Sequence, residues 1–261
     1  MHRHGTGPAV ILIPGLTCGA DVWDETVQRL EGRYELHVLT LSGFAGRPPI
    51  DGPLLPRVRE DLAAYIRAEG LRRPAVVGHS LGGFMALWLG ATEPDLVGPL
   101  VAVDGLPSLA AAMNVPGPQV EAAAAAMRDQ MASLDADAFA AQTRASLTGL
   151  MVSPDDVATV AQTAVRSDPP TVGKAMYEML TRDLRQDVAA IESDVLLFGP
   201  GVGTPEQRTM VESVYREQMA AVPTHEVVFA EGSRHFVMLD ARAFFAETLD
   251  AFLDARLGAA K

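Results

Sequence analysis

A chain of 261 residues, 48% of them hydrophobic, can bury one sizeable core, and its length suits one domain with an insertion better than two independent domains. Its net charge of −12 argues against nucleic acid or an anionic membrane as a partner. The single cysteine, Cys18, excludes an internal disulfide, and the longest apolar runs fall short of a membrane span.

The N-terminal residues are not typical of a signal peptide, because no apolar segment precedes the short apolar run at 10–13. A cytoplasmic location is therefore the default expectation. A secreted or periplasmic mature form that has lost its leader stays an alternative. We expect a monomer or a homodimer.

Strand and helix signals alternate from the N-terminus, which is typical of a mostly parallel sheet covered by helices. Buried strands are predicted at residues 10–13, 34–41, 74–77 and 100–103. A helix is predicted from Asp21, as its N-cap, to Leu30. Two more helices are predicted over 55–68 and 84–92, and the breakers at 43–49 indicate a loop.

The composition changes after the strand at 100–103. From Pro107 to about Ala190 there is no strand signal, only helical segments that contain Met113, Met127, Met131, Met151, Met176 and Met179. Strand signals resume at 195–198 and 226–229, each followed by a helical pattern, at 206–221 and 241–257. We therefore predict a core of residues 1–106 and 191–261, with a helical insertion of residues 107–190.

The most informative stretch is Gly78-His79-Ser80-Leu81-Gly82, the pattern G-x-S-x-G between a strand and a helix. A chain that reverses so sharply holds the serine in a strained conformation, and side chains at the flanking glycines would collide. The turn exposes the Ser80 hydroxyl and places the Leu81 amide at a helix N-terminus, where negative charge is stabilised. These are the requirements of an acyl-transfer nucleophile.

A nucleophilic serine also needs a base and an oxyanion hole. Of six histidines, His235 is the best candidate base, because it lies in the loop between the last strand and the last helix. His79 precedes the serine and is expected to point away from it. The predicted oxyanion donors are the amides of Leu81 and of Leu16, the latter in the loop after the first strand.

Together these motifs resemble those of the α/β-hydrolase superfamily over essentially the whole chain. The resemblance is carried by the elbow at 78–83, the loops at 13–16 and 43–46, and residues 234–236. It implies a mostly parallel twisted sheet flanked by helices, with the helical insertion as a cap that forms the substrate pocket. Members commonly have two strands before the one at Val10, where this chain has only nine residues. The sheet is therefore expected to have one or two strands fewer at its N-terminal end than is common in the superfamily.

The acid of the catalytic triad departs from the usual pattern. In most relatives it follows the strand that ends here at Phe198, but residues 199–205 contain no carboxylate. A minority of the superfamily places it after the strand that follows the elbow, where this chain has Asp104. A carboxylate is needed to fix the imidazole tautomer and to stabilise the imidazolium. Asp104 is our prediction and Glu206 and Asp240 are the alternatives, although Asp240 also suits the N-cap of the last helix.

The sequence thus predicts a serine hydrolase that cleaves carboxylic esters or related acyl compounds through an acyl-enzyme on Ser80. An apolar, uncharged small molecule is the expected substrate. The alternatives are a weakly catalytic or non-catalytic ligand-binding relative, and a perhydrolase or C–C hydrolase that uses the same residues. No cofactor or metal is expected, because the glycine run at 199–203 lacks the context of a dinucleotide site and no cluster of metal ligands stands out.

Overall fold

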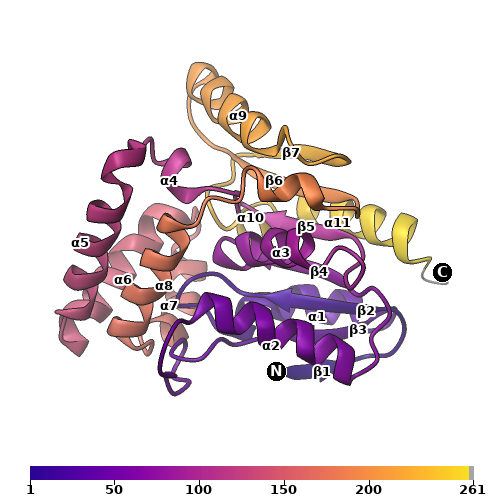
Figure 1. Cartoon of the computed structure of the whole chain (residues 1–261), viewed down its shortest axis with the longest axis horizontal. Coiled ribbons are helices and arrows are strands. Elements are labelled where there is room, and N and C mark those ends of the chain that lie inside the picture. Colours follow the sequence, from indigo (N-terminus) through magenta and orange to yellow (C-terminus); the bar gives the residue numbers. More distant parts are fainter. Residues whose placement is uncertain (259–261) are drawn as a thin grey trace.

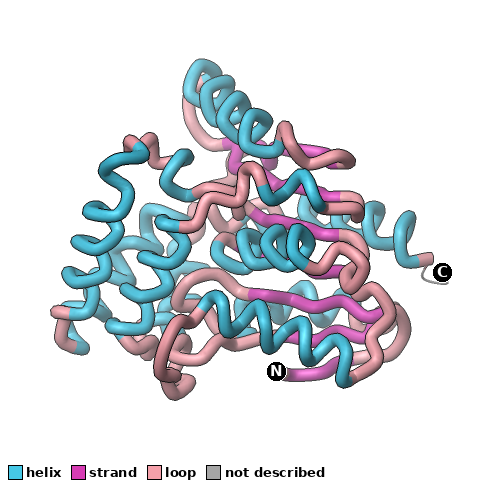
Figure 2. The backbone as a smooth tube through the Cα atoms, in the orientation of Figure 1, coloured by secondary structure: helices cyan, strands magenta, loops and turns pink. Residues whose placement is uncertain are grey.

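Seven strands form one sheet at the centre of the computed structural model, which describes residues 1–258 (Figures 1 and 2). The strand order is β1-β3-β2-β4-β5-β6-β7. Only β1 and β3 pair antiparallel, and all other neighbours are parallel. The strands are β1 (His2–His4), β2 (Ala9–Ile13), β3 (Glu35–Val38), β4 (Ala75–His79), β5 (Leu100–Val103), β6 (Val195–Gly201) and β7 (His225–Glu231). The predicted α/β architecture is confirmed, with one short strand before β2.

Helices cover both faces of this sheet because its buried strands are apolar on both sides. Along β2, Ile11 and Ile13 face one cluster, while Val10 and Leu12 face the other. The first cluster packs under α2 (Leu55–Ala68), α3 (Leu81–Thr92) and α9 (Pro205–Met219). The second packs under α1 (Asp24–Leu30), α10 (Val237–Asp240) and α11 (Arg242–Leu257).

The segment between β5 and β6 forms a helical, cap-like region at one end of the sheet (Figure 1). It contains α4 (Leu109–Ala112), α5 (Val120–Ala132), α6 (Ala136–Leu150), α7 (Pro154–Ala164) and α8 (Pro169–Thr181). Helix α5 packs against α8, and α6 packs against α7. As predicted, the hydroxyl of Ser153 caps α7 by accepting from the amide of Asp156. The described helices include none with the length and apolar character that crossing a membrane requires.

Two predicted helix caps are wrong. Residues 20–23 form a 3-10 turn before α1, and Asp21 accepts a hydrogen bond from the Thr163 hydroxyl of the cap-like region (2.8 Å). The residue before α11 is Ala241, with no side-chain cap, while Asp240 binds two amides elsewhere. In both cases the aspartate has a partner that is distant in the sequence.

Candidate active site

Ser80 lies at the sharp turn between β4 and α3. Its backbone is strained, with φ 54° and ψ −116°, and its N–H donates to the carbonyl of Val103 on the neighbouring strand (2.8 Å). A Cβ on Gly78 would lie 2.0 Å from the carbonyl oxygen of Gly82. One on Gly82 would lie 2.1 Å from that of Ile13. The predicted collision at both glycines is confirmed, and it explains why this turn requires them.

Asp104 occupies the corresponding place at the end of the next strand. It follows β5 with φ 49°, and its N–H donates to the Phe198 carbonyl of β6 (2.8 Å). Because β4 and β5 are parallel neighbours, Ser80 and Asp104 both lie at the carboxyl edge of the sheet. A left-handed backbone at such residues costs roughly 1–3 kcal/mol each, which is typical of functional sites.

His235 contacts Asp104 and neither of the alternative acids. Its Nδ1 lies 2.6 Å from Asp104 Oδ2, with the carboxylate 9% exposed. Glu206 is exposed at the start of α9 and accepts from the Thr204 hydroxyl (2.8 Å), and Asp240 accepts from backbone amides. The Asp104 contact stabilises the tautomer that carries the proton on Nδ1, which leaves Nε2 free to accept a proton.

Tyr215 of α9 is a site residue that sequence reasoning missed. Its hydroxyl donates to Asp104 Oδ1, the oxygen that His235 does not use. Burial, followed by the charge of Asp104, raises the pKa of Tyr215, so the hydroxyl stays protonated. A Cβ on Gly199 would lie 2.5 Å from the Phe229 ring and 3.1 Å from the Tyr215 ring. The glycine run after Phe198 was the available signal, because it makes room for this tyrosine.

His79 lies against the loop that carries His235. The two imidazole rings are 4.8 Å apart, and His79 Nε2 lies 3.2 Å from the carbonyl oxygen of His235. Its Nδ1 is buried and has no hydrogen-bond partner. Burial, followed by the nearby His235, holds the pKa of His79 well below its usual range. This histidine is therefore neutral and forms part of the cavity wall beside the serine.

The predicted oxyanion donors lie on two segments that border Ser80. Leu81 begins α3, and the first amides of a helix have no acceptor within it. The loop after β2 passes so close that a Cβ on Gly15 would lie 3.2 Å from the Cβ of Ser80. Leu16 follows in a turn closed by the Cys18 N–H and the Gly15 carbonyl (3.1 Å), and none of the hydrogen bonds described for the structure uses its N–H.

A cavity of about 490 Å³ connects these residues with the cap-like region. The core side of the cavity is lined by Leu16, Thr17, His79, Ser80, His235 and Phe236. Helices α4, α5, α6 and α8 supply the opposite wall, which is largely apolar and includes four methionines. Within residues 1–258, no group of three or more histidine, cysteine or acidic side chains could hold a metal ion.

Asp240 and Arg234 attach the cap-like region to the loop of His235. Asp240 accepts from the amides of Val152 and Arg234 (both 2.8 Å). The Arg234 guanidinium donates to the carbonyls of Thr148 and Met151 at the end of α6 (3.0 and 2.9 Å). Asp240 therefore has a structural role in place of the predicted helix cap.

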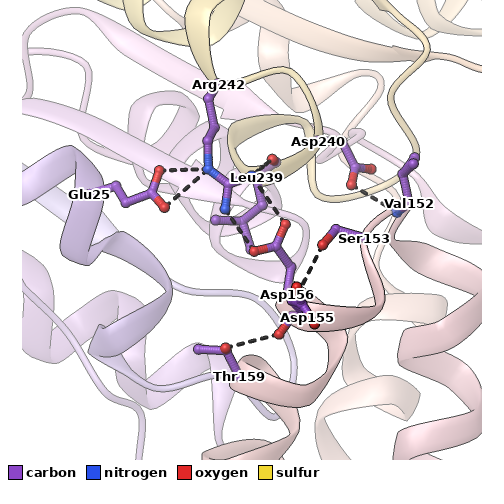
Figure 3. A network of polar contacts seen from close by, with 9 residues as sticks. All are labelled: Glu25, Val152, Ser153, Asp155, Asp156, Thr159, Leu239, Asp240 and Arg242. Atoms are coloured by element: carbon purple, nitrogen blue, oxygen red, sulfur yellow. Dashed lines mark hydrogen bonds and ion pairs between the residues drawn. The ribbon is translucent and has the colours of Figure 1, made fainter.

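Arg242 forms a second attachment beside the first, as Figure 3 shows. It pairs with Glu25 of α1 (2.8 Å) and with Asp156 at the start of α7 (2.7 Å). One arginine thus joins three elements that are distant in the sequence. The start of α7 is fixed to the core close to the place where Asp240 holds Val152.

Similar proteins are hydrolases. A pimeloyl-[acyl-carrier protein] methyl ester esterase of Vibrio atlanticus is 34% identical over 111 residues, 42% of each chain. A putative carbamate hydrolase, RutD, of Klebsiella pneumoniae is 36% identical over 101 residues, 38% of each. The aligned part thus spans about two fifths of these relatives.

Solved structures match the fold over almost the whole chain. The enol-lactonase of Burkholderia xenovorans has a TM-score of 0.78 at 17% identity, covering 97% of this chain and 95% of its own. A thermophilic esterase of Thermogutta terrifontis has a TM-score of 0.79 at 17% identity, covering 97% and 91%. The sequence itself matches the profile of the alpha/beta hydrolase family over residues 10–248. The chain therefore belongs to the alpha/beta hydrolase family.

Proposed function

We propose that the protein hydrolyses carboxylic esters or related acyl compounds through an acyl-enzyme on Ser80. The observation that carries this proposal is the 2.6 Å contact between His235 and Asp104, with His235 and Ser80 lining one cavity. This combination supplies a nucleophile, a base and an orienting acid.

In the proposed reaction, Ser80 Oγ attacks the carbonyl carbon while His235 Nε2 takes the hydroxyl proton. The amides of Leu16 and Leu81 donate to the oxyanion, and His235 then gives its proton to the departing alcohol. His235 next takes a proton from a water molecule that attacks the acyl carbon, and it returns this proton to Ser80 Oγ as the bond to the acyl group breaks and the acid leaves. Asp104 stabilises the imidazolium in both halves, and its second oxygen is held by Tyr215.

Two of the similar proteins support an ester as the bond cleaved, since one is a methyl ester esterase and another is an enol-lactonase. Hydrolysis of an ester or a lactone by a serine enzyme requires attack on a carbonyl that carries an oxygen leaving group. The serine at the elbow suits such attack through a covalent intermediate.

The test measures kcat and KM on chromogenic esters of graded acyl length. Ser80→Ala and His235→Ala should abolish turnover, and Asp104→Asn should lower kcat by about 10⁴, as in other triads of this type. Glu206→Gln is the matched control and should retain the parent rate, because that carboxylate is exposed and contacts Thr204.

No turnover of any ester by the parent protein would overturn the proposal. Ligand-induced thermal stabilisation without turnover would support a ligand-binding role instead. If Asp104→Asn kept the parent rate and Glu206→Gln lost it, the acid would be misassigned.

A further inference from the structure

The cap wall of the cavity contains polar side chains that catalysis does not use. Gln142, Thr143 and Ser146 come from one face of α6, and Gln130 comes from α5. Ser146 and Gln130 are exposed at the rim, whereas Gln142 is half-buried and Thr143 is only 8% exposed. A polar group thus lies well inside an otherwise apolar wall.

None of the side-chain hydrogen bonds given by the described residues involves Gln142 or Thr143. On the same helix, Thr148 shows the usual alternative, because its hydroxyl donates to the Arg144 carbonyl one turn earlier (2.9 Å). Thr143 makes no such bond, so its hydroxyl and the Gln142 amide are available to whatever fills the cavity.

The chemistry of the wall restricts the group that it would bind. The hydroxyl and the amide can each donate and accept a hydrogen bond. Among the described residues that line the cavity, none is an Asp, Glu, Lys or Arg. A buried carboxylate or ammonium would find no opposite charge there, which makes its binding costly. An amide or a hydroxyl group can be satisfied without that cost.

We propose that Thr143 and Gln142 form a polar subsite that binds an uncharged amide or hydroxyl group of the substrate. This group is distinct from the reacting carbonyl, because Ser80 belongs to the core and the subsite to the opposite, cap wall of the cavity. The inference rests on the proposed ester hydrolysis and specifies its substrate class as esters with a second, neutral hydrogen-bonding group. An alkyl chain would bury the two side chains unpaired, which typically costs tenfold to about a hundredfold in binding.

The experiment uses two series of esters. In the first, 4-nitrophenyl esters carry the variable chain on the acyl side. In the second, esters of one aryl acid carry it on the alcohol side. Within a series, a plain alkyl chain is compared with chains of equal length that carry an amide, a hydroxyl or a terminal carboxylate at successive positions. We expect an amide or hydroxyl ester to exceed its alkyl counterpart about tenfold in kcat/KM at one position. The carboxylate esters should be slower than both.

Thr143→Val and Gln142→Leu should remove this preference, because the amide and hydroxyl esters lose their partners and the alkyl esters, which no longer leave a polar group unpaired, gain in rate. Hydrolysis of the alkyl esters also shows that the variants fold. Thr148→Val is the matched control, since its hydroxyl is already paired, and it should keep the preference. Calorimetry on Ser80→Ala tests the subsite without turnover. It compares two non-hydrolysable substrate analogues of equal length, one with an amide group in the variable chain (the amide) and one with a plain alkyl chain (the alkane). The amide should bind more tightly, and adding Thr143→Val should remove the difference.

An alkyl ester favoured at every position, or a preference that survives both substitutions, would overturn the subsite while leaving ester hydrolysis intact. If no ester is hydrolysed, the proposed function fails, and the calorimetry still decides on the subsite. Equal binding of the amide and the alkane overturns it in that case.

Discussion

His79 should make the folded protein less stable in acid. Burial and the neighbouring His235 keep the pKa of this side chain well below its usual range, so the folded state leaves it neutral. The unfolded chain exposes it, and there it binds a proton below a pH of about 6.5. The unfolded state therefore binds more protons as the pH falls. The free energy of unfolding must decrease below that pH.

The size of the effect follows from one proton. A group that is protonated only in the unfolded state changes the free energy of unfolding by about 1.4 kcal/mol per pH unit well below its unfolded pKa. Between pH 7 and pH 5 the accumulated loss is about 2 kcal/mol. This is a substantial part of the 5–15 kcal/mol that is typical of a folded domain.

Urea unfolding at pH 7 and pH 5 measures this loss in the parent protein and in His79→Gln. The comparison uses the difference between the two pH values within each protein, so any loss of packing in the variant cancels. The variant should lose about 2 kcal/mol less than the parent on acidification. His37, whose pKa burial also lowers, keeps part of the dependence in both proteins.

His2→Gln, at an exposed histidine, is the matched control for the loss of an imidazole. Equal losses in the parent and in His79→Gln would refute the reasoning. They would mean that folded His79 binds its proton as readily as the unfolded chain does.

Three further substitutions test single contacts. Tyr215→Phe removes a donor to the Asp104 carboxylate but keeps the ring, so kcat should fall roughly tenfold to a hundredfold. This loss is much smaller than the one expected for Asp104→Asn, and an unchanged kcat would contradict the role of the hydroxyl. Gly82→Ala should lower the free energy of unfolding in urea by at least about 1–3 kcal/mol. Gly149→Ala is the control and should not lower it, because the space around Gly149 is open. Equal stabilities of the two variants would contradict the close approach of Ile13 to Gly82. Arg234→Gln frees the end of α6 and should raise KM more than it lowers kcat, and a change in kcat alone would contradict this.

Local patterns predicted those elements whose residues interact mainly with near neighbours. Helix α2 begins and ends where the apolar spacing placed it, at Leu55 and Ala68. The turn around Ser80 was predictable because its glycines are required by contacts within a few residues and with β2. The predicted caps at Asp21 and Asp240 were wrong because these carboxylates accept from the Thr163 hydroxyl and the Val152 amide, which are distant in the sequence.

Features of the site that depend on distant contacts left weaker signals. Tyr215 lies 111 residues from Asp104 in the chain. The one signal in the sequence was the glycine run in β6, where the absence of a side chain leaves space for the Tyr215 ring. The proposed polar subsite also left no signal in the sequence, because what distinguishes Thr143 from Thr148 is its place in the cavity lining and the pairing of the Thr148 hydroxyl. A helical pattern cannot distinguish a core face from a cavity face.

The glycine run also supports Asp104 as the proposed acid. Residues 199–201 continue β6 and pair with β7, so the strand does not end in a loop after Phe198. The Asp104 amide is held by Phe198, and Gly199 admits the Tyr215 ring that holds the carboxylate. The same stretch that lacks an acid therefore positions the one on the neighbouring strand. A Cβ at residue 199 would collide first with the Phe229 ring (2.5 Å), which packs against Tyr215, and would lie 3.1 Å from Tyr215 itself. A bulkier residue there would therefore press on the tyrosine that donates to Asp104 of the neighbouring strand.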